Sequence, residues 1–378
     1  MKSDNYKKRQ VRQAVPEDRP QLEDLWVRCF GDTEAFTKYY FDWYFPQNRV
    51  WVCEEDGRIL GQLHENSYDL TVFEAPARLP YIVGVSTEKD FRHQGIMRSL
   101  LMQSLQEAAE KELPFVYLMP ADEAIYLPFG FAYIYAQDVQ KIMAGSRGGS
   151  NAAKLRNGED SFAGIKAKRP DSYTAFAAAA AIGNSILEQH CDIYTQRDVW
   201  YLKRLAAENQ AEGGDFLLLY GEGSPAGYLS YGMEEGAEIR EFAVLKQYEE
   251  AAAAWLREAF SDTDVKLLPM PGAQVFPGAE KHPVIMGRIT NLPAFLSMLR
   301  PQEDFSVVLE IRDKQLPDND GVWSWECKGG RSSVFRSADQ QPEACMEIGE
   351  LIQWTLGYKE APNGLPSMNC RLFINEIV

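Results

Sequence analysis

A basic turn that contains a glycine, residues 92–95, joins a predicted strand to a predicted helix. A helix that begins after such a turn directs free backbone N–H groups and the positive end of its dipole toward one point, where phosphate groups bind. Gly95 allows the backbone to approach a ligand closely, and Arg92, His93 and Arg98 add positive charge. The turn therefore predicts a pyrophosphate site. An ordinary strand-to-helix turn with exposed arginines also fits these residues, because short glycine motifs match by chance.

The elements that must position this turn are predicted from hydrophobic periodicity and turn residues. A helix near the N-terminus begins at Pro16 and ends at Gly31, and Glu55-Asp56-Gly57 predicts a hairpin. Apolar residues at helical spacing follow the basic turn, and a short apolar run after them predicts a buried strand. The predicted strands cover residues 11–14, 49–53, 58–63, 67–73, 79–87 and 115–119, and the helix after the turn covers residues 95–112.

Residues 215–260 repeat this order in a degenerate form. The second copy has no glycine turn before its helix, and Glu249 and Glu250 begin that helix, so we do not expect it to hold a phosphate. A polar stretch at residues 144–160 predicts a domain boundary or a long loop, and an alanine-rich helix follows at 173–182. The second copy is predicted to contain strands at 216–220, 226–232 and 238–244 and a helix at 249–260.

A third unit begins near Arg288 and has the pattern of an α+β domain. Its predicted strands cover residues 305–312, 321–327 and 333–336, and its helix covers 347–356. The whole chain is therefore predicted to be a mixed α/β and α+β protein in which two related domains, each a central mixed sheet flanked by helices, precede an α+β domain.

The composition excludes several classes of protein. The 378 residues carry a formal net charge of −16, which opposes binding to nucleic acid. No apolar run approaches the length of a membrane span, and the charged N-terminus has no signal-peptide pattern, so no membrane association is expected. Six scattered cysteines and four histidines predict reduced thiols and no metal site. A cytoplasmic protein is the expectation.

The basic turn resembles the cofactor motif of the GNAT acetyltransferases, Arg/Gln-x-x-Gly-x-Gly/Ala. A bulky residue, Met97, replaces the last small residue, as in the enhanced-intracellular-survival (Eis) branch of that superfamily. The resemblance implies that acetyl-CoA is the co-substrate. It also implies that the backbone of Val85, Ser86 and Thr87 pairs with the pantetheine arm. The amides that would hold the pyrophosphate belong to the motif, Arg92-His93-Gln94-Gly95-Ile96-Met97, and to Arg98.

A second similarity to the GNAT family lies around Tyr126, which precedes Phe129-Gly130-Phe131. The resemblance implies that the Tyr126 hydroxyl lies near the sulfur of coenzyme A and protonates the departing thiolate. A phenol with a pKa near 10 can donate to such a leaving group within hydrogen-bond reach. Alternatively, Tyr126 packs on the two phenylalanines, which is the commoner fate of such a tyrosine.

The order of domains resembles the Eis type over nearly the whole chain. Residues 1–148 correspond to a GNAT domain with an acetyl-CoA site, 149–286 to a degenerate GNAT-like domain, and 287–378 to a sterol-carrier-protein-like domain. The resemblance implies that the terminal carboxylate, on Val378, enters the active site as the general base. It also implies a homo-oligomer, with a hexamer as one arrangement.

The predicted reaction is direct transfer of acetyl from acetyl-CoA to a primary amine of a small cationic acceptor, similar to an aminoglycoside or a polyamine. Two alternatives stay open: acetylation of protein lysines or N-termini, and a non-catalytic carrier or scaffold in which Trp323, Trp325 and Trp354 line an apolar pocket. The acidic residues considered for the acceptor pocket are Asp24, Asp32, Glu34, Glu65 and Glu376.

Overall fold

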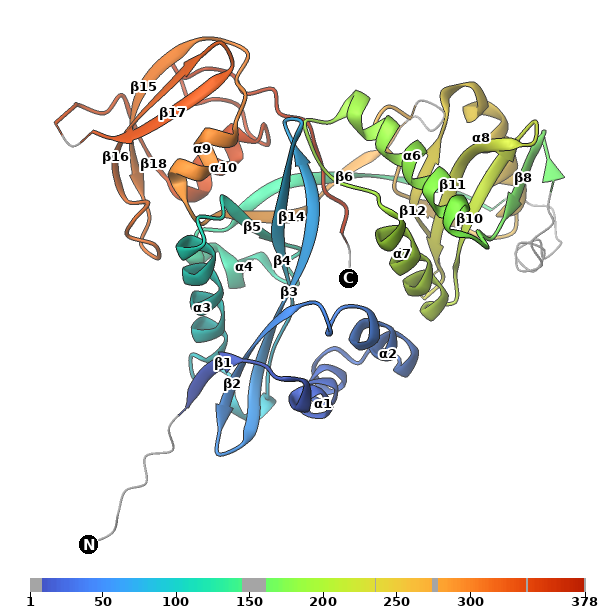
Figure 1. Ribbon diagram of the computed structural model, residues 1–378, viewed down its shortest axis with the longest axis horizontal. Helices are drawn as coiled ribbons and strands as arrows, with labels where there is room; N and C mark the ends of the chain where they lie inside the picture. Colours follow the sequence, from blue (N-terminus) through green and yellow to red (C-terminus); the bar gives the residue numbers. More distant parts are fainter. Residues whose placement is uncertain (1–8, 145–160, 235, 274–277, 338, 377–378) are drawn as a thin grey trace, which may run out of the picture. The chain divides into compact units, whose positions relative to one another are not determined.

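The computed structural model describes residues 9–144, 161–234, 236–273, 278–337 and 339–376 (Figure 1). The chain forms two compact units. Unit 1 combines Met1–Tyr135 with Pro283–Val378, and unit 2 is Ala136–His282. In the described part of the chain, no helix is both long and apolar enough to cross a membrane.

The first sheet of unit 1 is mixed. Its strands follow the order β1-β2-β3-β4-β5-β14-β6, in which β1 to β4 are antiparallel neighbours, β4 and β5 are parallel, and β5 and β14 are antiparallel. Strand β14 comes from far along the chain and completes this sheet. The strands are β1 (Gln10–Gln13), β2 (Arg49–Glu55), β3 (Arg58–Val72), β4 (Ala75–Thr87), β5 (Phe115–Leu118), β14 (Glu280–Ile289) and β6 (Ala132–Ile142).

Helices cover both faces of this sheet. Helix α1 (Arg19–Phe30) and helix α2 (Glu34–Trp43) lie on one face, and helix α3 (Ile96–Glu110) lies on the other (Figure 1). Neighbouring residues of β3 show the two faces: the Gln62 side chain donates to the Leu22 carbonyl of α1, whereas Gly61 packs under Ile96 of α3. Gly31 ends α1 as expected, with φ of 76°.

Two features of this region differ from the sequence expectation. Helix α2 was not predicted, because aromatic residues on much of its surface obscure the amphipathic pattern. The predicted strands 58–63 and 67–73 form one continuous strand, β3. Two of the polar residues between them have buried partners: Trp51 Nε1 donates to Glu65 and the Tyr40 hydroxyl donates to Asn66.

The C-terminal part of unit 1 forms a separate sheet in the order β17-β16-β15-β18, with helices α9 (Leu292–Met298) and α10 (Ile348–Thr355). Trp323, Trp325 and Trp354 are buried, and the Trp325 ring lies 5.8 Å from that of Trp354. These tryptophans therefore belong to a packed core. The strands are β15 (Phe305–Arg312), β16 (Gly321–Lys328), β17 (Arg331–Arg336) and β18 (Ala344–Glu347).

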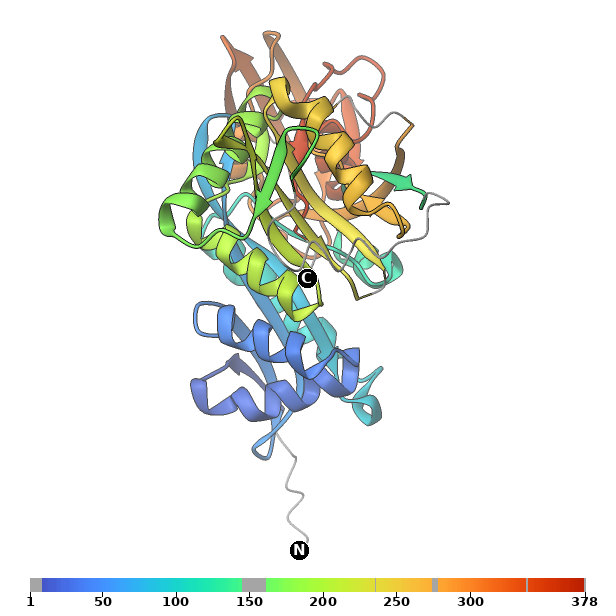
Figure 2. The same ribbon diagram turned by 90° about the vertical axis from the view of Figure 1, so that its right-hand side faces the viewer.

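Unit 2 is built on a second mixed sheet, in the order β6-β13-β12-β11-β10-β8-β7. Helices α6 (Tyr173–His190) and α7 (Val199–Ala211) lie on one face and helix α8 (Glu249–Ala259) on the other (Figure 2). The later part of β6 supplies the strand beside β13, and neither β6 nor α7 was predicted. The other strands are β7 (Ser161–Phe162), β8 (Ile165–Lys168), β10 (Asp215–Gly221), β11 (Ser224–Gly232), β12 (Ala237–Val244) and β13 (Val265–Leu267). Most of the predicted loop at 144–160 lies outside the described residues.

Candidate functional site

Strands β4 and β5 of unit 1 separate beside the predicted cofactor residues. Their parallel pairing is confined to Tyr81 with Tyr117 and Ile82 with Leu118. Just beyond it the register against β3 shifts and Gly84 has φ of 62°. A Cβ at Gly84 would lie 2.3 Å from Cζ3 of Trp26, so both the conformation and the space require glycine. Val85, Ser86 and Thr87 lie beyond the last residues of β4 that pair with β5.

The basic turn follows β4 through a short 3₁₀ segment, Lys89–Phe91. The turn is fixed by side-chain contacts with nearby carbonyls: Arg92 Nε donates to Thr87 O at 3.3 Å, and Gln94 Nε2 donates to Asp90 O at 3.2 Å. Gly95 is the N-cap of α3, with φ of 80°, and open space surrounds the position of its missing Cβ. The backbone conformation, rather than crowding, therefore requires this glycine.

The beginning of α3 suits an anion. Its first turn contains no acidic residue, and among the described residues no side chain caps it. Arg92, His93 and Arg98 are exposed around it, and Arg98 also lies over the Phe129 ring at 5.3 Å. The N–H groups of the first turn, the helix dipole and the two arginines act in the same direction, so the turn can hold a pyrophosphate.

Tyr126 lies at the end of a short helix, α4 (Glu123–Tyr126), which Asp122 caps by accepting from the Ala124 N–H. Its ring packs at 5.7 Å from Phe131, in the apolar cluster that also contains Ile96. Val85 and Met97 pack against that cluster. Tyr126 therefore packs on a phenylalanine, as in the alternative, and shares its apolar cluster with Ile96 of the cofactor motif. Burial raises the pKa of the Tyr126 hydroxyl to about 12, which keeps it protonated at neutral pH.

A buried ion pair from the C-terminal half of unit 1 anchors the loop after Tyr126. Arg288 Nε donates to the Phe129 carbonyl at 2.6 Å, and its Nη2 donates to both carboxylate oxygens of Asp313 at 2.6 and 2.7 Å. Gln315 Nε2 also donates to the Pro128 carbonyl at 2.9 Å. The sequence analysis did not identify Arg288 or Asp313, because nothing in their spacing connects them with the tyrosine loop.

The five candidate acids have different environments. Asp32 accepts a hydrogen bond of 2.6 Å from Nε1 of Trp26, the residue that covers the β4 bulge. Glu65 is buried with Trp51, and burial raises the pKa of its carboxyl. Asp24 and Glu34 are exposed.

The C-terminal tail is buried as far as it is described. Ile374 is fully buried, Asn375 and Glu376 are nearly so, and the Phe373 ring lies 6.1 Å from that of Tyr135. The predicted base, Val378, lies outside the described residues.

Two family models match this chain. Residues 10–134 match the acetyltransferase (GNAT) domain, and residues 292–363 match the sterol carrier protein domain. The chain therefore contains a GNAT acetyltransferase domain in its N-terminal part and a sterol carrier protein domain in its C-terminal part. The resemblance inferred from the two motifs is confirmed.

Solved structures share this architecture along most of the chain. A conserved protein of unknown function from Enterococcus faecalis V583, a probable N-acyltransferase, has a TM-score of 0.75 and 20% identity, over 93% of this chain and 91% of its own. Eis1 from Mycobacterium abscessus has a TM-score of 0.71 and 13% identity, over 97% and 99%. A GCN5-related N-acetyltransferase from Anabaena variabilis has a TM-score of 0.72 and 18% identity, over 92% and 90%. These matches confirm the predicted fold class. A comparison with curated proteins found no match.

Proposed function

We propose that this enzyme transfers acetyl from acetyl-CoA to a primary amine of a small cationic acceptor. The observation that carries the proposal is the separation of β4 from β5, followed by a basic turn and a helix whose first turn lacks acids. A cofactor with an extended neutral arm and a pyrophosphate fits these two neighbouring features. The test is thermal unfolding: acetyl-CoA should raise Tm, because a ligand that binds the folded state stabilises it. No shift would favour the non-catalytic alternative.

In this proposal each part of the site has one role. The backbone of Val85, Ser86 and Thr87 holds the pantetheine arm, and the amides of residues 93–98 hold the pyrophosphate. The neutral amine attacks the thioester carbonyl, a C–N bond forms, and a backbone amide near Val85 stabilises the developing oxyanion. The C–S bond then breaks, the thiolate takes the proton of Tyr126, and the amine proton passes to a base, for which we propose the Val378 carboxylate.

A cationic acceptor is supported by charge and by the position of one acid. The net charge of −16 attracts cations, and Asp32 lies against the tryptophan that covers the β4 bulge. A small polyamine or an aminoglycoside-like molecule has the required primary amines. A protein lysine or N-terminus has the same nucleophile and is the competing acceptor, so an acceptor panel has to contain both kinds.

A glycine replacement tests the cofactor turn. Gly95→Val should weaken acetyl-CoA binding by about tenfold or more, because a branched residue at φ of 80° costs about 1–2 kcal/mol and shifts the turn. Isothermal titration calorimetry measures the Kd. The matched control is Gly57→Val: Gly57 has φ of 78° and equally open surroundings in the β2–β3 hairpin. An equal loss of affinity for acetyl-CoA in both variants would show that the turn at 92–95 is not part of the cofactor site.

A C-terminal extension tests the terminal carboxylate. Residues added after Val378 should lower turnover by about a hundredfold, because the proposed base leaves its position while the buried tail, including Ile374, stays anchored. The same residues added before Met1 should leave turnover unchanged. Turnover is measured from the thiol released at saturating acetyl-CoA. Full activity of the C-terminally extended protein would reject Val378 as the base.

A further inference from the structure

Unit 2 repeats the pairing at the strand end that precedes the cofactor turn of unit 1. Thr87, the last residue of β4, pairs with Gly61 of β3, and Val244, the last residue of β12, pairs with Gly227 of β11. The next N–H in each copy donates to the residue before that glycine: Glu88 N to Leu60 O at 2.8 Å, and Leu245 N to Ala226 O at 2.9 Å. The degenerate repeat predicted from the sequence therefore extends to individual backbone hydrogen bonds.

The two copies also separate their parallel strands at the same point. In unit 2, β12 pairs with β13 only through Ala237–Ile239, and a register shift against β11 follows immediately at Arg240. In unit 1 the last parallel pair is at Ile82, Val83 still pairs with His64, and the bulge follows at Gly84 and Val85. Strand β4 ends at Thr87 and strand β12 ends at Val244, so these two residues correspond. Two positions earlier in each strand, Phe242 corresponds to Val85.

The copies differ in the turn. Each has a 3₁₀ segment after the strand, Lys89–Phe91 in unit 1 and Lys246–Tyr248 in unit 2. In unit 1 the four residues 92–95 then precede α3, whereas α8 begins directly at Glu249. Unit 2 therefore retains the counterpart of the pantetheine segment and lacks the counterpart of the pyrophosphate turn.

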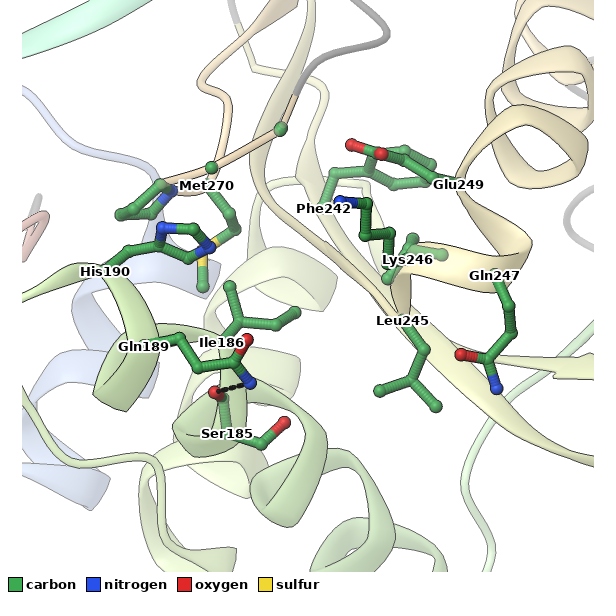
Figure 3. Close-up of a pocket in the computed structure, with 14 residues that line it drawn as sticks. Ser185, Ile186, Gln189, His190, Phe242, Leu245, Lys246, Gln247, Glu249 and Met270 are labelled. Carbon is green, nitrogen blue, oxygen red and sulfur yellow. Dashed lines mark hydrogen bonds between the residues drawn. The ribbon is translucent and has the colours of Figure 1, made fainter.

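A pocket of about 330 Å³ lies at this retained segment (Figure 3). Phe242 and Leu245 line one side, Ile186 and Gln189 of α6 line another, and Met270 lies beside His190. Val244 also lines the pocket. Most of these side chains are apolar. The neutral hydrogen-bonding side chains at the pocket are Ser185, Gln189 and Gln247, and His190 also lines it.

We propose that the pocket of unit 2 binds a neutral, amide-bearing chain of the pantetheine type and excludes the phosphates of a nucleotide. The inference rests on the role proposed for Val85 and Thr87 in unit 1, because their counterparts Phe242 and Val244 line the pocket. A carboxylate of Glu249 at the start of α8 replaces the basic turn and repels phosphate. Lys246 also lines the pocket, but it belongs to the 3₁₀ segment and does not replace the missing turn, whose free amides would hold a phosphate.

The experiment is methyl NMR on the full chain labelled at Ile δ1 and Met ε methyl groups. Coenzyme A is added first, to occupy unit 1, and its binding is followed at Ile96 and Met97 in the cofactor turn. Pantetheine is then titrated and followed at Ile186 and Met270 in the pocket. We expect pantetheine to shift the pocket methyls, and adenosine 3′,5′-bisphosphate to leave them unshifted.

The outcomes test the pocket of unit 2 and the cofactor site of unit 1 separately. Unshifted Ile186 and Met270 methyls at millimolar pantetheine, in a protein whose cofactor turn responds to coenzyme A, would overturn the pocket and leave the proposed function intact. A response to the bisphosphate equal to that to pantetheine would overturn the neutral ligand class. No response of Ile96 and Met97 to coenzyme A would instead contradict the proposed function.

Matched substitutions provide a second measurement. Val244→Phe fills the pocket of unit 2 and should weaken pantetheine binding by about tenfold or more, with the response of unit 1 to coenzyme A unchanged. Thr87→Phe, at the equivalent strand end of unit 1, should weaken the response of unit 1 to coenzyme A and leave pantetheine binding in unit 2 unchanged. If Val244→Phe weakened binding equally in unit 1 and unit 2, unit 2 would have no separate pocket. If this variant does not fold, the titration of the wild-type protein tests whether the pocket binds pantetheine.

Discussion

Tyr126→Phe is expected to lower kcat by about a hundredfold or more and to leave the Kd for acetyl-CoA nearly unchanged. The phenol supplies the proton that the thiolate takes when the C–S bond breaks, and general-acid catalysis of this kind contributes about 10²–10⁴-fold. The ring packing with Phe131 is preserved in the variant, so binding should survive. Thiol release at saturating acetyl-CoA gives kcat, and calorimetry gives the Kd.

The pKa of Tyr126 adds a pH criterion to this experiment. Burial raises that pKa to about 12, and the acid form is present below the pKa, so ionisation of Tyr126 should not lower kcat between about pH 6 and 10. Tyr133→Phe is the matched control, since Tyr133 lies in the following strand, is partly exposed and has no role in the proposed transfer. Turnover of Tyr126→Phe equal to that of the control would exclude Tyr126 as the acid.

Asp313→Ala is expected to lower the free energy of unfolding by about 3–5 kcal/mol, because it leaves Arg288 charged and buried without its partner. The side chains of both residues are essentially inaccessible, with 0% and 1% exposed. Chemical denaturation measures the loss. Because Arg288 also holds the Phe129 carbonyl, kcat should fall in the folded fraction as well.

Two further variants distinguish the effect of breaking the buried ion pair on stability from the effect of losing a charge in general. Asp69→Ala removes an ion pair with Arg78 whose side chains are more than half exposed, and should change stability by about 0.5 kcal/mol or less. Replacing both Arg288 and Asp313 with apolar residues should cost less than Asp313→Ala alone, since no charge is then left unpaired. A double variant less stable than the single one would contradict this explanation.

The local features of the cofactor region could be predicted from the sequence, because they depend on residues close together in the chain. The turn at 92–95, helix α3 and Gly31 as a helix end were recognised from glycines and helical spacing. The two motifs indicated the GNAT class and the order of domains indicated the sterol carrier domain, and family models match both. The roles of Tyr126 and Val378 stay predictions.

Features that depend on distant contacts were missed. The order of the sheets places β14 beside β5 and the later part of β6 beside β13, and no periodicity of the sequence reports such pairing. Strand β3 was divided because buried polar residues interrupt its alternation, including Glu65, which has a buried partner in Trp51. The Arg288–Asp313 pair was missed because its function depends on a distant contact, the one with the loop after Tyr126.

The most direct test of the proposed acetyl transfer is thiol release from acetyl-CoA in the presence of a panel of amines. The panel should contain aminoglycosides, simple polyamines, lysine peptides and a neutral amine of similar size. The proposal predicts release that depends on a small cationic primary amine and an equivalent amount of its N-acetyl product. Release with lysine peptides alone would establish the competing acceptor, and the absence of release with every amine, despite binding of acetyl-CoA, would contradict the proposed reaction.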